Sequence, residues 1–331
     1  MSLFAALTTF LHSGPHDEAT FDALAHQLFA YQFAHNAPYR RLCEARGQTP
    51  ETVTWWQEIP TVPAAAFKRF SLTCVPEEQC VRVFHSSGTT GSDTSRHFLS
   101  AEALELYRTS LVAGFARALP LDEVMGTVAL MPSPREAPHS SLSFMLETLG
   151  AIFFTPAQLA PWLRLQREPL CYFGTAFAFV HLLDATEGEA FCLPKGSIVI
   201  ETGGFKGRSR EISREELYAL FTERLGVAPE RCYSEYGMSE LASQFYSQGV
   251  AGPKLAPPWL KTRVIDPVTG AEALPGEPGL LAHYDLANLN SVLAIQTEDR
   301  GIAVPHGGFQ LLGRAPGAIL RGCSLLTEEL L

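Results

Sequence analysis

The chain has 331 residues and a formal net charge of −10, and 46% of its residues are hydrophobic while 18% are charged. This length and composition predict an ordinary soluble globular protein of one large or two moderate domains, and the acidic charge argues against binding along the phosphate backbone of a nucleic acid. The seven cysteines include no CxxC pair, the N-terminus lacks the basic region of a signal peptide, and no apolar run is long enough to span a bilayer, so we expect a reduced, cytoplasmic protein.

The predicted elements begin with a helical segment over about residues 18–46, where apolar side chains recur at helical spacing before Gly47. A proline-rich connector follows, and a short strand over residues 81–84 leads into a loop rich in glycine and hydroxyl side chains. Helices and strands then alternate. Strands are expected over 126–131, 151–154, 170–173 and 198–200, and helices over 100–118, 140–149, 156–168, 177–184 and 213–226. This alternation predicts an α/β fold with a mainly parallel sheet.

The pattern changes from about residue 249, where short apolar runs are separated by Gly, Pro and Asn. Such runs predict a β-rich subdomain built from hairpins, with strands over 262–265, 280–284, 292–295 and 309–312. We therefore expect three parts: a helical segment and connector over 1–80 packed on the core, an α/β core over 81–248, and the β-rich subdomain over 249–331.

The glycine-rich loop is the first candidate site. Glycines let backbone N–H groups approach an anion, and the hydroxyl side chains add further donors, so the loop is suited to phosphate. Its spacing is not that of the P-loop of NTPases, and an ordinary turn after a strand is the alternative interpretation. The loop consists of Ser86, Ser87, Gly88, Thr89, Thr90 and Gly91.

The second candidate site is the sequence Tyr-Gly-Met-Ser-Glu at residues 236–240. Glu240 supplies a carboxylate that can bind Mg²⁺, and Tyr236 supplies a ring that can stack on a base, with Gly237 allowing a turn between them. The alternative interpretation is a loop whose glutamate is only solvated.

Together, in this order and about 150 residues apart, the two motifs resemble those of the adenylate-forming superfamily of acyl- and aryl-CoA ligases, adenylation domains and luciferases. Three more segments are similar to family motifs: Glu201–Gly204, Thr297–Gly301 and Gly313–Arg314. The resemblance implies that Gly203 and Gly204 lie on the adenine side of a nucleotide site, and that Asp299 and Arg314 bind the ribose.

Within this superfamily the chain is most similar to the acyl-protein synthetase branch, the acid-activating component of the bacterial bioluminescence fatty acid reductase complex. The residues that carry this similarity are Ser92–Arg96 after the glycine loop, Glu201–Arg208, and Arg321–Leu325 near the C-terminus. The last of these contains Cys323, and the resemblance implies that this cysteine is acylated.

The resemblance also leads us to expect an adenylate-forming N-terminal domain without the C-terminal lid, and so without the lid's lysine. Lys206, Arg208, Arg210 and Arg321 are candidate replacements for that lysine, and each of them also fits an ordinary surface charge.

The reaction implied is ATP-dependent formation of an acyl-AMP from a fatty or aryl acid. Residues 86–91, with Thr89 in a catalytic role, would hold the phosphates, and Mg²⁺ would bind Glu240. Tyr236 would contact adenine, and His139, before a predicted helix, would line the carboxylate site.

The acyl group would pass to Cys323, to an acyl carrier protein, to CoA or to an acyl reductase subunit. Two alternatives stay open: an acid–CoA ligase of the phenylacetate type, and a degenerate acyl- or nucleotide-binding partner without turnover. Phe173, Phe177 and Phe179 fit either a hydrophobic acyl tunnel or the core.

Overall fold

A computed structural model describes residues 1–331 apart from 14–15, 87–93, 187, 204–211 and 316–331. The chain forms two compact units. Unit 1 contains Met1–Phe115, Gly237–Gln244 and Leu255–Leu331, and unit 2 contains Ala116–Tyr236 and Phe245–Lys254. The three-part division expected from the sequence stays a prediction.

Unit 1 begins with helices α1 (Leu3–Ser13), α2 (Glu18–His35) and α3 (Ala37–Ala45). The helical segment predicted over 18–46 is therefore confirmed, but as two helices divided at Asn36. Asn36 has extended backbone angles that end α2, and its side chain accepts a hydrogen bond from the Tyr39 N–H and so caps α3. Helix α1 was not predicted.

The sheet of unit 1 confirms the predicted hairpins. Strands β10 (Leu260–Ile265), β11 (Pro278–Asp285), β12 (Ala294–Val304) and β13 (Gly308–Arg314) pair antiparallel in sequence order. The short strand β1 (Val62–Pro63) pairs parallel with β12 at Ile295 and Gln296, so the connector before the glycine loop lies beside β12. A separate hairpin, β2 (Arg82–His85) and β3 (Arg96–Leu99), flanks that loop, and α4 (Ala101–Ala118) follows it.

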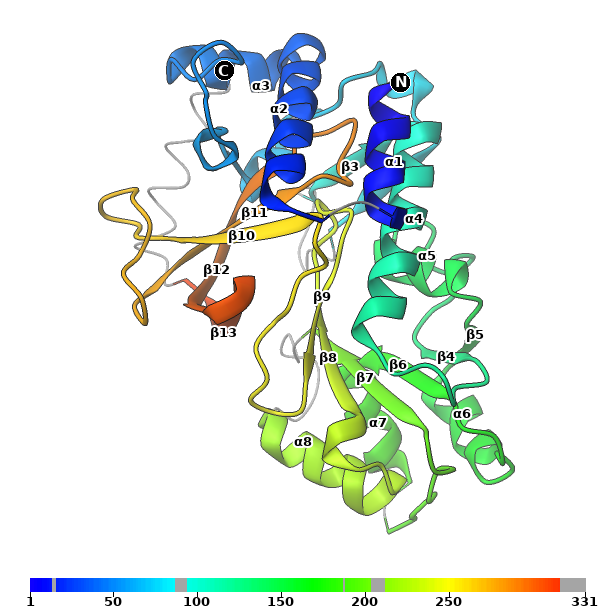
Figure 1. Ribbon diagram of the computed structural model, residues 1–331. Helices are drawn as coiled ribbons and strands as arrows, with labels where there is room; N and C mark the ends of the chain where they lie inside the picture. The colour runs from blue at the N-terminus through cyan, green and yellow to red at the C-terminus, as the bar shows by residue number, and fades with distance from the viewer. Residues whose placement is uncertain (14–15, 87–93, 187, 204–211, 316–331) are drawn as a thin grey trace. The chain divides into compact units, whose positions relative to one another are not determined.

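Unit 2 is a sheet of six strands in the order β5-β4-β6-β7-β8-β9, parallel except for β9, which confirms the mainly parallel α/β fold (Figure 1). Its strands are β4 (Thr127–Leu130), β5 (Ile152–Phe154), β6 (Cys171–Thr175), β7 (Ile198–Thr202), β8 (Cys232–Tyr236) and β9 (Phe245–Gln248). Its helices are α5 (Ser141–Thr148), α6 (Pro156–Leu163), α7 (Ala176–Ala185) and α8 (Arg214–Leu220). Helix α6 ends at Leu163 rather than near residue 168.

The core of unit 2 explains why its strands lack alternation. Strands β4 and β7 are buried at every residue, as is usual for parallel strands covered on both faces. Phe173 and Phe179 are fully buried, and the Phe179 ring lies 5.0 Å from the Phe221 ring, which favours the core interpretation for these two residues.

Helix α8 and the π-helical turn after it (Phe221–Leu225) end at Gly226, whose φ of +68° is the left-handed conformation that glycine adopts readily. Ser213 caps α8, since its hydroxyl accepts a hydrogen bond from the Glu216 N–H. Over the part of the chain that the structure describes, no helix has the length and apolar character needed to cross a membrane.

Candidate active site

The base of the glycine-rich loop is closed by two serines. The Ser86 N–H donates to the Ser95 carbonyl (3.1 Å), and the Ser95 N–H donates to the Ser86 hydroxyl (3.0 Å). These bonds continue the ladder of β2 and β3, in which His85 pairs with Arg96. The predicted phosphate-binding residues Ser87, Gly88, Thr89, Thr90 and Gly91 lie outside the described residues.

Two of the predicted motifs meet in unit 1, at the base of this loop. The Ser239 hydroxyl donates to the His85 carbonyl at 3.2 Å, and the Ser95 hydroxyl hydrogen-bonds the Glu240 carboxylate. Glu240 is 4% exposed. Burial raises the pKa of Glu240, and the hydrogen bond from Ser95 opposes that rise because it stabilises the ionised form. The carboxylate predicted to bind metal thus contacts Ser95, which closes the base of the loop predicted to bind phosphate.

The backbone around Glu240 is held by two buried side chains that no motif predicted. His97 places Nδ1 2.8 Å from the Ser239 carbonyl and Nε2 3.0 Å from the Asn288 Oδ1. The Asn288 amide nitrogen in turn donates to the carbonyls of Glu240 and Val292, both at 2.9 Å. Burial lowers the pKa of His97 to about 4, so the ring is neutral at physiological pH and acts as a support.

Asp285 anchors the chain that follows Glu240. Its buried carboxylate accepts hydrogen bonds from the Ala242 N–H (2.9 Å), the Ser243 hydroxyl (2.7 Å) and the Ala287 N–H (3.0 Å). Burial raises the pKa of Asp285 to about 6, even though these three donors favour the ionised form. The segment that carries Glu240 is therefore fixed on both sides.

The predicted ribose-binding pair is also brought together in unit 1. Asp299 lies directly opposite Arg314 in the ladder of β12 and β13. The Arg314 Nε is 3.7 Å from the Asp299 Oδ1, and its Nη1 is 2.7 Å from the Glu298 Oε2. The Arg314 charge also acts on the Glu240 carboxylate and favours its ionised form. Four predicted residues from three distant segments, Ser86, Glu240, Asp299 and Arg314, thus belong to one unit.

The surroundings of Glu240 fit a Mg²⁺ ion that is shared with phosphates. The buried carboxylate forms no ion pair with a described residue, and the described residues contain no group of three or more His, Cys, Asp or Glu side chains able to hold a metal. Proteins often bind Mg²⁺ through one or two carboxylates together with substrate phosphates, without an all-protein cage.

The other predicted nucleotide-binding residues belong to unit 2. Gly203 follows β7, is exposed, and has a φ of +68°, while Tyr236 is the last residue of β8 and packs its ring 5.7 Å from the Phe245 ring. Since β7 and β8 are parallel neighbours, both residues lie at the carboxyl edge of the sheet, where α/β proteins commonly bind ligands. Gly204 lies outside the described residues.

A buried charged cluster lies at the same edge of unit 2, and sequence reasoning missed it. The Lys254 ammonium donates to the Ser234 carbonyl (2.9 Å) and hydroxyl (2.6 Å), while Thr202 hydrogen-bonds the Glu235 carboxylate. Burial raises the pKa of Glu235 and lowers that of Lys254. Glu201, on the neighbouring strand, is 3.2 Å from the Arg214 guanidinium.

The structure adds little to the roles predicted for two further residues, His139 and Cys323. His139 is exposed in the loop before α5, the helix that Ser140 caps. Cys323 lies outside the described residues. Among the described cysteines Cys192 is exposed, whereas Cys43 is buried and burial raises its pKa to about 12.

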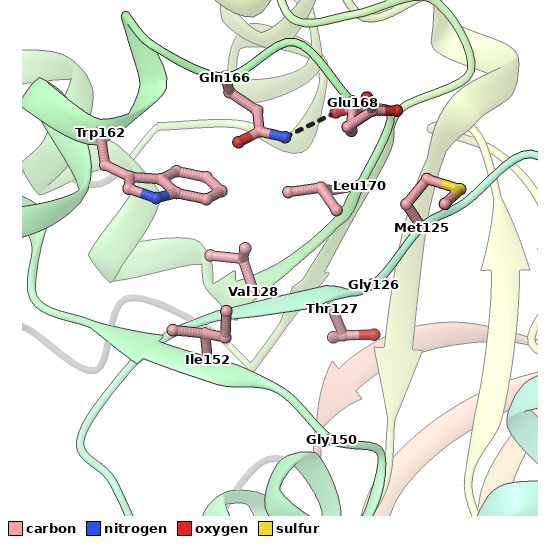
Figure 2. A pocket seen from close by; sticks show the side chains of 10 residues that line it. All are labelled: Met125, Gly126, Thr127, Val128, Gly150, Ile152, Trp162, Gln166, Glu168 and Leu170. Carbon is pink, nitrogen blue, oxygen red and sulfur yellow. Dashed lines mark hydrogen bonds between the residues drawn. The ribbon is translucent and has the colours of Figure 1, made fainter.

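A cavity of about 380 Å³ opens at the other end of the sheet in unit 2 (Figure 2). Its wall is mainly apolar, and the Trp162 ring and the Leu170, Val128 and Ile152 side chains point into it. It lies where β4 and β6 begin, whereas Gly203 and Tyr236 follow the carboxyl ends of β7 and β8. The cavity is therefore separate from the predicted nucleotide-binding residues. It is lined by Met125, Gly126, Thr127, Val128, Gly150, Ile152, Trp162, Gln166, Glu168 and Leu170.

The fold is that of the adenylate-forming enzymes. A crystal structure of 2-hydroxyisobutyryl-CoA ligase with 2-HIB-AMP matches 90% of this chain and 67% of its own, with a TM-score of 0.69 and 15% identity. A crystal structure of ATP-bound MatB from Rhodopseudomonas palustris matches 74% of this chain and 50% of its own, with a TM-score of 0.51 and 18% identity. At these identities the likeness concerns the fold alone.

The family follows from the sequence comparison. The profile of the family described as "Acyl-protein synthetase, LuxE" matches residues 137–331, which is more than half of the chain, and the chain belongs to this family. It is 24% identical over 327 residues to a long-chain-fatty-acid–luciferin-component ligase of Vibrio harveyi, covering 91% of this chain and 85% of that protein. It is 24% identical over 339 residues to the protein of the same name from Aliivibrio fischeri, covering 92% and 86% respectively.

Proposed function

We propose that this protein activates a carboxylic acid with ATP, forming an acyl-AMP and pyrophosphate, and passes the acyl group to a thiol. The observation that carries the proposal is the contact in unit 1 between the base of the glycine-rich loop and the second motif, through Ser95 and Glu240. A buried carboxylate at the base of a predicted phosphate-binding loop suits a metal-bound triphosphate.

Each predicted residue has a place in this reaction. Residues 86–91, including Thr89, hold the phosphates through backbone N–H groups and hydroxyls. Asp299 accepts hydrogen bonds from the ribose hydroxyls, and Arg314, its neighbour across the ladder, donates to the ribose. Tyr236 contacts adenine, with Gly203 and Gly204 on the adenine side.

Glu240 is the residue that would hold Mg²⁺, with Ser95 orienting its carboxylate. When bound, the ion offsets negative charge on the phosphates. Glu240 must be ionised for this role, and the Ser95 hydroxyl and the Arg314 charge both favour that form. His97 and Asn288 keep the backbone of Glu240 in place.

We favour a fatty acid as the acid that this protein activates. Both relatives from Vibrio and Aliivibrio are named as long-chain-fatty-acid ligases. The acceptor is Cys323, an acyl carrier protein, or an acyl reductase subunit, and His139 lines the site of the acid's carboxylate. A cytoplasmic location is part of the proposal, because none of the described cysteines forms a disulfide.

A second candidate function is that of an acid–CoA ligase acting on an aryl or small acid. The observation that favours it is the likeness to 2-hydroxyisobutyryl-CoA ligase over 90% of this chain. In that case CoA takes the acyl group, and no acyl-protein forms.

One experiment tests the proposal and separates these acceptors. The protein is incubated with ATP, Mg²⁺ and either dodecanoate, hexadecanoate, phenylacetate or benzoate, with and without CoA. Pyrophosphate exchange, acyl-CoA and intact protein mass are then measured for the wild type, for Cys323→Ser, and for Cys192→Ser, which removes an exposed thiol and serves as the control.

An adduct that hydroxylamine releases, present in Cys192→Ser and absent in Cys323→Ser, supports transfer to Cys323. Exchange with acyl-CoA and no adduct supports the CoA ligase. ATP binding without exchange for any acid would overturn the proposed activation and leave a nucleotide-binding partner without turnover.

A further inference from the structure

Lys68 is an exposed cation in unit 1 that no sequence motif marks. It is the last residue of the 3₁₀ helix η2 (Ala64–Lys68), which directly follows β1 and contacts β12 and β3. Its ammonium makes no hydrogen bond or ion pair with any residue that the structure describes. The pairing of β1 with β12 at Ile295 and Gln296 fixes where this helix begins.

The residue before Lys68 is packed against the support of Glu240. The Phe67 ring is fully buried and lies edge-on to the His97 ring, with 6.1 Å between centroids and an interplanar angle of 86°. His97 in turn holds the Ser239 carbonyl, one residue before Glu240. These contacts link the residue before Lys68, through His97, to the residue before Glu240. The Lys68 charge acts on the Glu240 carboxylate, as does that of Arg314.

The two cations near Glu240 differ in how their charges are compensated. Arg314 lies 2.7 Å from the Glu298 carboxylate and 3.7 Å from that of Asp299, so much of its charge is already offset. Lys68 has no such carboxylate among the described residues. An ammonium that forms no ion pair with a described residue can take an anionic oxygen of a substrate.

We propose that Lys68 is a catalytic residue of the adenylation step, and that its ammonium contacts an oxygen of the pyrophosphate that leaves. This inference rests on the proposed function. In that step a carboxylate oxygen of the acid forms a bond to the α-phosphorus of ATP. The bond from that phosphorus to the bridging oxygen breaks, and its electron pair leaves with pyrophosphate. No proton is transferred, and Lys68 stays protonated throughout.

The role proposed for Lys68 follows from where negative charge increases during the reaction. Negative charge increases on the leaving pyrophosphate as the bond to the α-phosphorus breaks, so a fixed cation there stabilises the transition state more than the ground state. The cations considered from the sequence as replacements for a lid lysine, Lys206, Arg208, Arg210 and Arg321, lie outside the described residues.

The test compares Lys68→Met with Lys68→Arg and with Arg69→Met, which removes the charge of the neighbouring exposed residue. We measure ATP–pyrophosphate exchange with the best acid found for the wild type. We also measure the affinity for an acylsulfamoyl-adenosine analogue by calorimetry. This analogue lacks the β- and γ-phosphates, so the proposed contact does not contribute to its binding.

We expect Lys68→Met to lower the kcat of exchange about 10²–10³-fold, the usual effect of losing one preorganised charge contact, with a smaller change in the KM for ATP. Lys68→Arg recovers part of the rate, Arg69→Met stays near the wild type, and all variants keep the affinity for the analogue.

Exchange by Lys68→Met within about threefold of the wild type, far below that usual effect, would overturn the inference while leaving the proposed function intact. Weakened analogue binding by Lys68→Met would also overturn it, since that indicates a structural role. Absence of exchange in the wild type would refute the proposed function itself.

Discussion

Replacing Ser95 by alanine tests the link between the two motifs through a single hydroxyl. Ser95 is 3% exposed, and its hydroxyl hydrogen-bonds the Glu240 carboxylate. The two bonds that close the glycine-rich loop use the Ser95 backbone N–H and carbonyl, and alanine keeps both. The substitution therefore removes one donor to Glu240 and leaves the base of the loop closed.

The size of the effect follows from the charge on the acceptor. A hydrogen bond to a charged group contributes about 1.5–3 kcal/mol, which corresponds to roughly a 10- to 150-fold change in an equilibrium constant. Burial already raises the pKa of Glu240, and the Ser95 bond lowers it, so Ser95→Ala raises this pKa further. A larger fraction of the carboxylate is then protonated at low pH, and protonated Glu240 binds metal poorly.

The assay is the pH profile of pyrophosphate exchange for the wild type, Ser95→Ala and the control Ser100→Ala. Ser100 caps α4, since its hydroxyl accepts a hydrogen bond from the Ala103 N–H at 3.2 Å. We expect the acidic limb of the Ser95→Ala profile to move to higher pH, with a rate loss of about tenfold or more on that limb. An acidic limb that superimposes on the wild-type limb would refute the assigned role of Ser95.

Two further predictions concern stability. Burial raises the pKa of Asp285 from 3.8 to about 6, so its contribution to the free energy of unfolding is fully present below pH 3.8 and is lost as the pH rises to about 6. The thermal midpoint should therefore fall over this pH range in the wild type, and Asp285→Asn should flatten the fall. A variant whose midpoint falls with pH as steeply as that of the wild type would contradict the assignment. Gly174→Ala should lower the free energy of unfolding of unit 2 by about 1–3 kcal/mol, and with it the thermal midpoint, because the added Cβ would lie 3.0 Å from Leu130 and Phe179 atoms. A midpoint equal to that of the wild type would show that these neighbours shift at little cost.

The local signals in the sequence predicted most of the elements. The alternation of strands and helices from residue 126 onward follows directly from apolar runs and caps such as Ser213. Asn36 shows the limit of periodicity, because apolar spacing continued across a residue whose side chain ends one helix and begins another. Helix α1 (Leu3–Ser13) has no acidic residue in its first turn, and its cap is the second residue of the chain, since the Ser2 hydroxyl accepts a hydrogen bond from the Ala5 N–H.

Only part of the candidate site could be predicted from the sequence. Glu240, Asp299 and Arg314 stand in motifs whose order along the chain can be compared with a family. Ser95, His97, Lys68 and Asn288 matter through contacts with residues that are distant in the sequence. Only Ser95 stands in a segment that resembles the family, and nothing in that segment indicates its contact with Glu240. The sequence does not indicate which distant residue a single lysine or histidine contacts, so the roles of such residues are recognised only when the fold is known.

The pairing of β1 with β12 also determines the order in which the protein can fold during synthesis. Val62 leaves the ribosome well before its strand partner Ile295, since the whole of unit 2 lies between them in the sequence. The parallel strands of unit 2 all lie between these two points, so their sheet can form first. The N-terminal helices must wait, with their apolar faces uncovered, until the last strands emerge. We therefore expect nascent chains that stop before residue 294, where β12 begins, to depend on chaperones more than chains that extend past β13 do.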